Sequence, residues 1–305
     1  MTTETQFLRQ HIQSLIKKLP SSVPSQMSLV FDGGAFNGGF GAGVALYLKE
    51  MELQQMMHVK RISGCSVGAL LAVWYMMGCD ERFMPFAQHL YSSVRTTLNL
   101  TGYGKTIGTF IFDLIPSDEE VHRFHKKLYI NYYDTRSRRQ RVVSRFRDRR
   151  HLITCLIRSA FIPYLSDDKA RYQTRYIDGI TPYLLRGDPH TLFVNLITPL
   201  KLMRAFKIKS EQDVHYRLLA GVSDANEFFT TGASDMCTYV DQWSLYMQCF
   251  VGLRLWGCLC LLWIIEGFRK VSENAPARLK ENNRCIKGID CFRKWLVRRI
   301  TLALL

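Results

Sequence analysis

The sequence predicts an α/β fold with a mainly parallel central sheet and a helical C-terminal extension. From residue 27 onward, short apolar runs typical of buried strands alternate with helical segments. A glycine-rich turn and then a Gly-x-Ser-x-Gly turn each separate a run from the helix after it. Such alternation favours parallel strands with helices on the faces of the sheet. The 305 residues suffice for one large domain and an extension.

The first 26 residues predict an amphipathic basic helix that ends before Pro20 and Pro24. Its apolar positions recur at helical spacing: Phe7, Leu8, Ile12, Leu15, Ile16 and Leu19. Arg9, Lys17 and Lys18 interrupt any continuous hydrophobic stretch, so a signal peptide is not expected. The helix either docks on the domain, which we favour, or anchors the chain to a membrane.

The elements expected in the first half follow in chain order. They are a strand at 27–31, a glycine-rich turn at 32–43, a helix at 44–51, a strand at 59–62, an apolar helix at 68–77, a helical stretch to about 93, a glycine-rich loop at 101–108 and a helix at 118–127. The strand at 59–62 is broken by Ser63-Gly64, which begins the serine turn.

The second half adds further strands before a change in composition. We expect a hairpin of 128–133 with 141–146, a helix at 151–160, a short extended run at 175–177, a strand at 192–197 and helices at 211–219 and 221–229. Residues 242–265 are apolar apart from Arg254, and 269–299 are strongly basic. The expected organisation is therefore an N-terminal helix at 1–26, one α/β domain at 27–240 and an apolar, then basic extension at 241–305.

The Gly-x-Ser-x-Gly turn is the first candidate site. Ser66 stands between Gly64 and Gly68, after an apolar strand and before an apolar helix. A nucleophilic serine on such a sharp turn needs small residues two positions before and after it. The N–H groups at the start of the next helix can then face a reacting carbonyl. We expect Ser66 to be the nucleophile.

The glycine-rich turn after the first strand is the second candidate site. Closely spaced glycines let several N–H groups converge on one anion. The candidate oxyanion-hole residues are Gly33, Gly34, Ala35, Phe36 and Asn37. A dinucleotide-binding loop fails on spacing, because Val44 stands where Gly39-x-Gly41 would require Gly or Ala. No Gly-Lys-Ser/Thr sequence follows, which excludes a nucleotide-hydrolase phosphate loop.

Asp178-Gly179 is the third candidate site. An aspartate at a strand end, followed by a flexible glycine, can reach back to a serine hydroxyl. A plain Asp-Gly turn is the alternative. A Ser-His-Asp triad in hydrolase order would instead need a histidine after Asp178, either His190 or His215. The serine follows only two strands, earlier than in such hydrolases, so we favour a dyad of Ser66 and Asp178.

Together these three sites resemble the patatin-like phospholipases. The small-residue stretch 158–163, which ends in Pro163, also resembles that family, and the similarity covers about residues 27–195. It implies a three-layer patatin-like α/β fold, a Ser-Asp dyad without a catalytic histidine, and hydrolysis of phospholipid or neutral-lipid acyl esters.

The sequence departs from the family pattern at three positions. Ala35 replaces the third glycine of the Asp-Gly-Gly-Gly stretch, Asn37 replaces its basic residue, and Ile180 replaces a small residue after Asp178-Gly179. Ala35 keeps its N–H, whereas Asn37 loses a charge. These departures keep a second hypothesis open, a catalytically weak or inactive module that binds anionic membranes or nucleic acid through its basic surface.

No cofactor or metal ion is expected. Cys258 and Cys260 are too close for a zinc pair, and His122 with His125 has no further ligand cluster nearby. The odd number of cysteines, nine, favours reduced thiols in the cytoplasm over a disulfide framework.

The charge predicts an anionic partner. The net charge is +15, and arginines crowd the segment from Arg136 to Arg150. RNA- and DNA-recognition sequences are missing, so an anionic membrane surface is expected and nucleic acid is not. The sequence leaves the oligomeric state open.

The apolar tract at 242–265 has three interpretations: a helix packed on the domain, an interfacial helix, or a single membrane span. Arg254 at its middle costs a span about 2.5 to 3.5 kcal/mol. Trp256 and Trp263 suit an interface. We favour packing, then the interface. With the basic, apolar-rich tail at 292–305, the tract predicts a cytoplasmic, peripherally membrane-associated protein.

Overall fold

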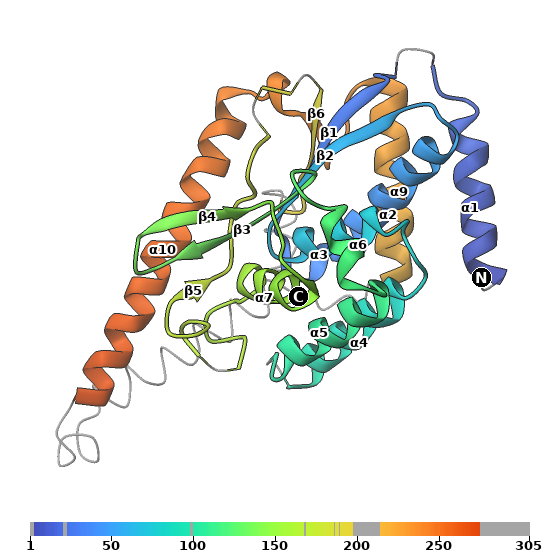
Figure 1. Ribbon diagram of the computed structural model, residues 1–305. Coiled ribbons are helices and arrows are strands. Elements are labelled where there is room, and N and C mark those ends of the chain that lie inside the picture. The colour runs from blue at the N-terminus through green and yellow to red at the C-terminus, as the bar shows by residue number, and fades with distance from the viewer. Residues whose placement is uncertain are drawn as a thin grey trace.

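The computed structural model describes residues 3–20, 23–97, 100–167, 169–185, 187–188, 190–197 and 214–274. They form a mixed α/β fold around a seven-stranded sheet (Figure 1). The strands are β1 (Gln26–Phe31), β2 (His58–Gly64), β3 (Leu128–Asp134), β4 (Arg139–Val143), β5 (Tyr176–Ile177), β6 (Thr191–Val194) and β7 (Cys237–Tyr239).

The helices precede, connect and follow these strands. They are α1 (Thr3–Ile16), α2 (Gly38–Leu53), α3 (Val67–Met76), α4 (Phe83–Thr97), α5 (Tyr103–Leu114), α6 (Asp118–His122), α7 (Arg149–Ser159), α9 (Val214–Thr231) and α10 (Leu245–Asn274), with 3-10 turns η1 (Ala35–Asn37) and η2 (Val240–Gln242). Most of the expected elements are present, including the hairpin of β3 and β4.

The sheet has the strand order β4-β3-β2-β1-β6-β7, and β5 also pairs with β3. The strands β3, β2, β1 and β6 run parallel to their neighbours within this set, whereas β4, β5 and β7 are antiparallel. The predicted mainly parallel sheet is therefore confirmed. The carboxyl ends of the parallel strands meet at one edge, where ligand sites of such sheets lie.

Helices cover the two faces of the sheet unequally. In β1, Leu29 and Phe31 pack in the main core with helices including α1, α2, α3 and α9, whereas Val30 packs on the other face with Trp243 and Val251. Because successive strand residues point to opposite faces, β1 separates two layers. The outer layer is α10, which Figure 1 shows on the opposite side of the molecule from α1, α2 and α9. Ile12 and Ile16 are buried in the main core, so α1 docks on the domain.

The prediction of a glycine-rich loop at 101–108 is wrong, because α5 begins at Tyr103. Only Gly102, just before the helix, has a left-handed backbone, with φ of 75°. Ile107, Phe110, Ile111 and Leu114 are buried at helical spacing. Packing of this apolar stripe outweighs the cost of about 1 kcal/mol for each glycine inside the helix.

Further elements differ from the sequence prediction. The helix α2 begins at Gly38, inside the glycine-rich turn predicted at 32–43. The helices predicted at 211–219 and 221–229 form one helix, α9, which begins at Val214; residues 211–213 lie outside the described residues. Gly221 does not break α9. Because it has no side chain, α9 can pack directly against the Phe40 carbonyl of α2 at this position. The helix α6 ends at His122, earlier than predicted, and β7 was not predicted.

Candidate active site

Ser66 lies on a sharp turn between β2 and α3. Its backbone has φ of 55° and ψ of −133°, a conformation that non-glycine residues rarely adopt. Ser66 is buried. A Cβ on Gly64 would lie 2.3 Å from the Gly68 oxygen, and a Cβ on Gly68 would lie 2.4 Å from the Asp32 oxygen. The turn therefore accepts only glycine at both flanking positions.

The sheet itself brings Asp178 to this turn. β2 pairs with β3 as far as Gly64 opposite Ile130, and β5 pairs with β3 at Tyr133 and Asp134. β4 occupies the other edge of β3, so β2 and β5 approach each other along one edge from opposite directions. Each strand ends near the middle of β3, and the next residues are the serine turn and Asp178. The structure thus brings the two predicted catalytic residues together.

The end of α7 holds Asp178-Gly179 in place. The Asp178 N–H donates to the Phe161 oxygen at 2.8 Å, and the Gly179 N–H donates to the Ser159 oxygen at 3.2 Å. A Cβ on Gly179 would lie 2.5 Å from the Asn131 oxygen. This close contact explains why the predicted dyad turn has glycine at position 179.

The Asp178 carboxyl group is buried. Its Oδ1 accepts the Ile180 N–H at 2.7 Å, whereas Oδ2 has no hydrogen-bond partner among the described residues. Burial raises the pKa of Asp178 to about 6, and the neighbouring Ser66 side chain acts in the opposite direction. A buried carboxylate oxygen with spare capacity beside a serine suits a proton acceptor.

Sequence reasoning missed the role of Ser159 and Asn131. The Ser66 N–H donates to Ser159 Oγ at 2.9 Å, and Ser159 Oγ donates to the Asn131 backbone oxygen at 2.7 Å. Asn131 Nδ2 donates to the Thr181 oxygen at 2.7 Å. These bonds connect the serine turn to the Asp178 turn through β3. The available signal was the small-residue stretch that contains Ser159.

The predicted oxyanion loop joins β1 to α2. Gly33, Gly34 and Ala35 line one cavity together with Ser66, and Ala35 and Phe36 line another. Ala35 has a left-handed backbone with φ of 45°. Asn37 Nδ2 donates to the Leu196 oxygen at 2.9 Å, which ties the loop to the segment after β6. Asn37 therefore helps to hold this loop against the segment after β6.

Two arginines that the sequence did not assign to the site contact this loop. Arg217 of α9 is buried and donates from Nη1 to the Phe36 oxygen at 2.6 Å. It brings a cation to the loop in which Asn37 replaces a basic residue. Arg254 of α10 binds the Asp32 carboxylate, at the start of the loop, through both terminal nitrogens. No local pattern in the sequence indicates either contact.

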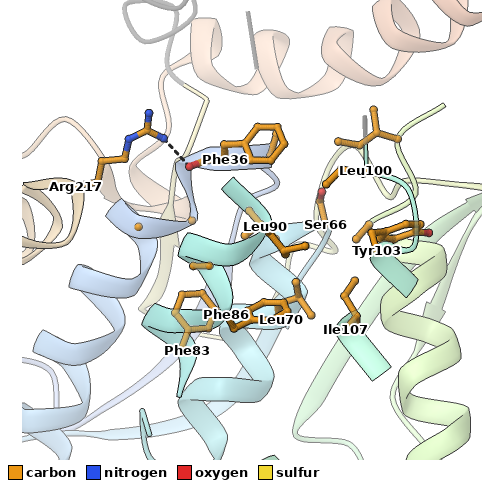
Figure 2. Close-up of a pocket in the computed structure, with 17 residues that line it drawn as sticks. Phe36, Ser66, Leu70, Phe83, Phe86, Leu90, Leu100, Tyr103, Ile107 and Arg217 are labelled. Atoms are coloured by element: carbon orange, nitrogen blue, oxygen red, sulfur yellow. Dashed lines mark hydrogen bonds between the residues drawn. The ribbon is translucent and has the colours of Figure 1, made fainter. Parts of the chain in front are cut away.

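Two apolar cavities meet at Ser66. The first has about 760 Å³, counting the part open to solvent. Figure 2 shows Ser66 pointing into it between Phe86 and Leu90 of α4 and Tyr103 and Ile107 of α5. In Figure 2 the Arg217 guanidinium lies beyond Phe36, away from Ser66.

The second cavity lies between the oxyanion loop, Asp178 and α10. It has about 920 Å³ on the same basis, and Ser66, Ala35 and Ile162 belong to both cavities. Leu261, Leu262 and Ile265 give it an apolar wall on α10. A serine at the junction of two apolar cavities can meet an ester whose two sides are both apolar.

The two histidines of the alternative triad lie elsewhere. His190 immediately precedes β6, and its backbone oxygen accepts the Ser28 N–H of β1. It therefore lies toward the amino ends of the parallel strands β1 and β6, whereas Ser66 follows the carboxyl end of β2. His215 is exposed on the first turn of α9. Neither histidine lines a cavity that contains Ser66.

The described residues include no group of three or more metal-ligating side chains. His122 and His125 lie on the surface with 3.3 Å between Nδ1 and Nε2. The described cysteines are all free thiols, and Cys285 and Cys291 lie outside the described residues.

Comparison with known protein families gives one match. The model described as patatin-like phospholipase matches residues 29–182, about half of the chain. This range includes the oxyanion loop, the serine turn and Asp178, and it ends before α9 and α10. The search of curated proteins finds no match.

Proposed function

Because the chain belongs to the patatin-like phospholipase family, we propose that it hydrolyses lipid acyl esters through a Ser66 acyl-enzyme with Asp178 as base. The observation that carries this proposal is the meeting of β2 and β5 along one edge of β3, with Ser66 and a buried Asp178 beside each other. The family supplies the substrate class, and the local geometry supplies the assignment of roles.

The chemistry proceeds by two acyl transfers. Ser66 Oγ attacks the ester carbonyl carbon while Asp178 accepts its proton, and the loop at 33–37 stabilises the oxyanion through backbone N–H groups. The tetrahedral intermediate expels the alcohol, which takes the proton from Asp178. Water then attacks the acyl-enzyme with Asp178 again as base, which releases the fatty acid and restores Ser66.

The apolar cavities support a lipid substrate. The cavity between α4 and α5 would hold the acyl chain, and the cavity beside α10 would hold the apolar part of the alcohol side. Both cavities are lined chiefly by aliphatic and aromatic side chains. Such linings bind hydrocarbon chains through loss of water-exposed area.

The protein would attach peripherally to an anionic membrane surface and bind its lipid substrate there. Seven arginines at and after the β3–β4 turn are exposed: Arg136, Arg138, Arg139, Arg141, Arg145, Arg147 and Arg150. Over Leu245–Gly267, α10 is long and apolar enough to cross a membrane. One face of it contacts the domain through Val251, Leu259 and Leu262, only 22% of this window is buried, and its outer face exposes Leu253, Trp256 and Trp263. An interfacial position accommodates both faces of this helix.

A fluorophosphonate probe tests the assignment of Ser66. We expect wild type to be labelled at Ser66 and to release fatty acid from lipid vesicles. Ser66→Ala should lose both properties, and Asp178→Asn should lose most turnover, since an amide accepts no proton. His215→Ala is the matched control and should keep near-wild-type turnover. Wild-type protein that neither reacts with the probe nor cleaves ester would favour a non-catalytic, membrane-binding module.

A further inference from the structure

Arg254 makes a two-pronged ion pair across the molecule. Its Nη1 donates to Asp32 Oδ2 at 2.7 Å, and its Nη2 donates to Asp32 Oδ1 at 2.5 Å. The Arg254 side chain is 9% exposed, and that of Asp32 is fully buried. Since these residues lie 222 positions apart, the pair attaches the first half of α10 to the end of β1.

Asp32 occupies a key position between the two halves of the candidate site. It directly precedes Gly33, and its N–H donates to the Val194 oxygen at 3.0 Å. Its carbonyl group lies so close to α3 that Gly68 admits no side chain there. Any shift of Asp32 therefore moves the start of the oxyanion loop and presses on the helix that follows Ser66.

The ion pair supports the charge of Asp32 and fixes its orientation. Burial raises the pKa of the Asp32 carboxyl group, and Arg254 acts in the opposite direction by its charge and its hydrogen bonds. The planar guanidinium binds both carboxylate oxygens, so it fixes orientation as well as position. A lysine at this place would supply the charge without the fork.

We propose that Arg254 is a positioning residue which holds the oxyanion loop through Asp32, so that α10 is a structural part of the active site. The proposal rests on the proposed acyl-hydrolase function. It goes beyond the family match, which ends at residue 182. Arg254 also lines the cavity beside α10, and the role proposed for it is the support of Asp32 rather than a step of the acyl transfer.

A second contact of α10 provides a matched control. Arg171 donates from Nη2 to Glu266 Oε2 at 2.7 Å, which also attaches α10 to the domain. Within the described part of the chain, Glu266 pairs with Arg171 and lines neither cavity at Ser66. Glu266→Gln therefore removes an anchor of α10, whereas Arg254→Gln removes an anchor and also the support of Asp32.

The electrostatic surroundings of Asp178 provide an independent readout. Its charged and titratable neighbours are Arg254, Asp32, Cys65, Cys258, Tyr103 and the Ser66 hydroxyl. Arg254 lowers the pKa of Asp178, and Asp32 raises it. Loss of Arg254 should therefore move the acid limb of the kcat/KM profile to higher pH.

Steady-state kinetics on a soluble short-chain ester test the proposal without membrane effects. We expect Arg254→Gln to lower kcat about 10- to 100-fold with little change in KM, because displaced oxyanion donors act mainly on the transition state. Arg254→Lys should fall between this variant and wild type. Glu266→Gln should stay within about twofold of wild type. Asp32→Asn combined with Arg254→Gln should lose less than the product of the single losses, because one interaction connects them.

Hydrogen exchange of the backbone amides at 33–37 tests the same support without catalysis. Exchange there should accelerate in Arg254→Gln and Arg254→Lys but not in Glu266→Gln. If wild type has no esterase activity, the proposed function fails, and exchange still decides whether Arg254 holds the loop. Equal kcat losses in Arg254→Gln and Glu266→Gln, or unchanged exchange at 33–37 in a folded Arg254 variant, would overturn the proposal.

Discussion

At the scale of single residues, three residues of the candidate site have a strained backbone. Ala35, Ser66 and Ile180 all have positive φ, at 45°, 55° and 62°. Non-glycine residues persist in this region only where their surroundings hold them. The Ser66 N–H is held by Ser159, and the Ile180 N–H by Asp178 itself. The bulky Ile180, a departure from the family pattern, is accommodated by that local hydrogen bond.

The pH profile should report the ionisation of Asp178. Its pKa is raised to about 6 by burial. The base accepts a proton only when ionised, so kcat/KM should rise with pH through about pH 6 and then level off. An ester with no titratable group, measured from pH 4.5 to 8.5, gives the profile. An acid limb near pH 4 would contradict a desolvated Asp178.

At the scale of helices, the contact between α2 and α9 places Arg217 on the oxyanion loop. A Cβ on Gly43 would lie 2.0 Å from the Leu218 oxygen, and one on Gly221 would lie 2.0 Å from the Phe40 oxygen. The two helices therefore meet backbone to backbone at glycines. This close approach positions α9 so that Arg217 reaches the Phe36 oxygen.

Gly221→Ala should destabilise the protein by about 1 to 3 kcal/mol, because the added methyl group forces two helix backbones apart. Gly108→Ala is the control. It also lies within a helix, but its new Cβ would meet nothing nearer than 3.9 Å, so it should be neutral or stabilising by up to about 1 kcal/mol. Urea denaturation followed by circular dichroism measures both. Equal stability of the two variants would show that the α2–α9 contact tolerates separation.

At the scale of the whole molecule, α10 has two different faces. Its inner face carries Arg254 and the buried Leu259, Leu262 and Ile265. Its outer face exposes Trp256 by 63% and Trp263 by 58%. Removal of everything after residue 240 would strip a layer from the sheet, so substitutions on the outer face test membrane contact more cleanly than truncation. The basic run at 269–299 and the tail at 292–305 lie largely or wholly outside the described residues.

Vesicle binding should have a salt-sensitive part and a salt-resistant part. Each basic residue near an anionic leaflet contributes about 1 kcal/mol, and this attraction decays within about 8 Å at physiological salt. Wild type should co-sediment strongly with anionic vesicles and weakly with neutral ones. The double substitution Trp256→Ala and Trp263→Ala should lower the binding that remains at high salt.

Leu53→Ala controls for loss of an exposed apolar side chain outside α10, since Leu53 is 60% exposed at the end of α2. It should leave vesicle binding unchanged. Equal binding of wild type to neutral and anionic vesicles at low salt would show that charge does not recruit the protein. An unchanged salt-resistant part in the double variant would rule out α10 as the apolar contact.

The sequence by itself determined the strand–turn–helix units around the oxyanion loop and the serine turn. It did so because buried strands, glycine turns and apolar helices leave local patterns, and the steric demand at Gly64 comes from Gly68, four residues away. The same local reasoning failed at α5, where buried packing of Ile107 and Phe110 outweighs glycine content.

Only the tertiary structure decided how distant parts meet. β3 aligns the ends of β2 and β5, which brings Asp178 beside Ser66 across more than a hundred residues of chain. The tertiary structure also pairs Arg254 with Asp32, which gives this arginine within an apolar helix a buried carboxylate partner at the end of β1. Such contacts depend on register and packing between elements, and hydrophobic periodicity within one element carries no information about them.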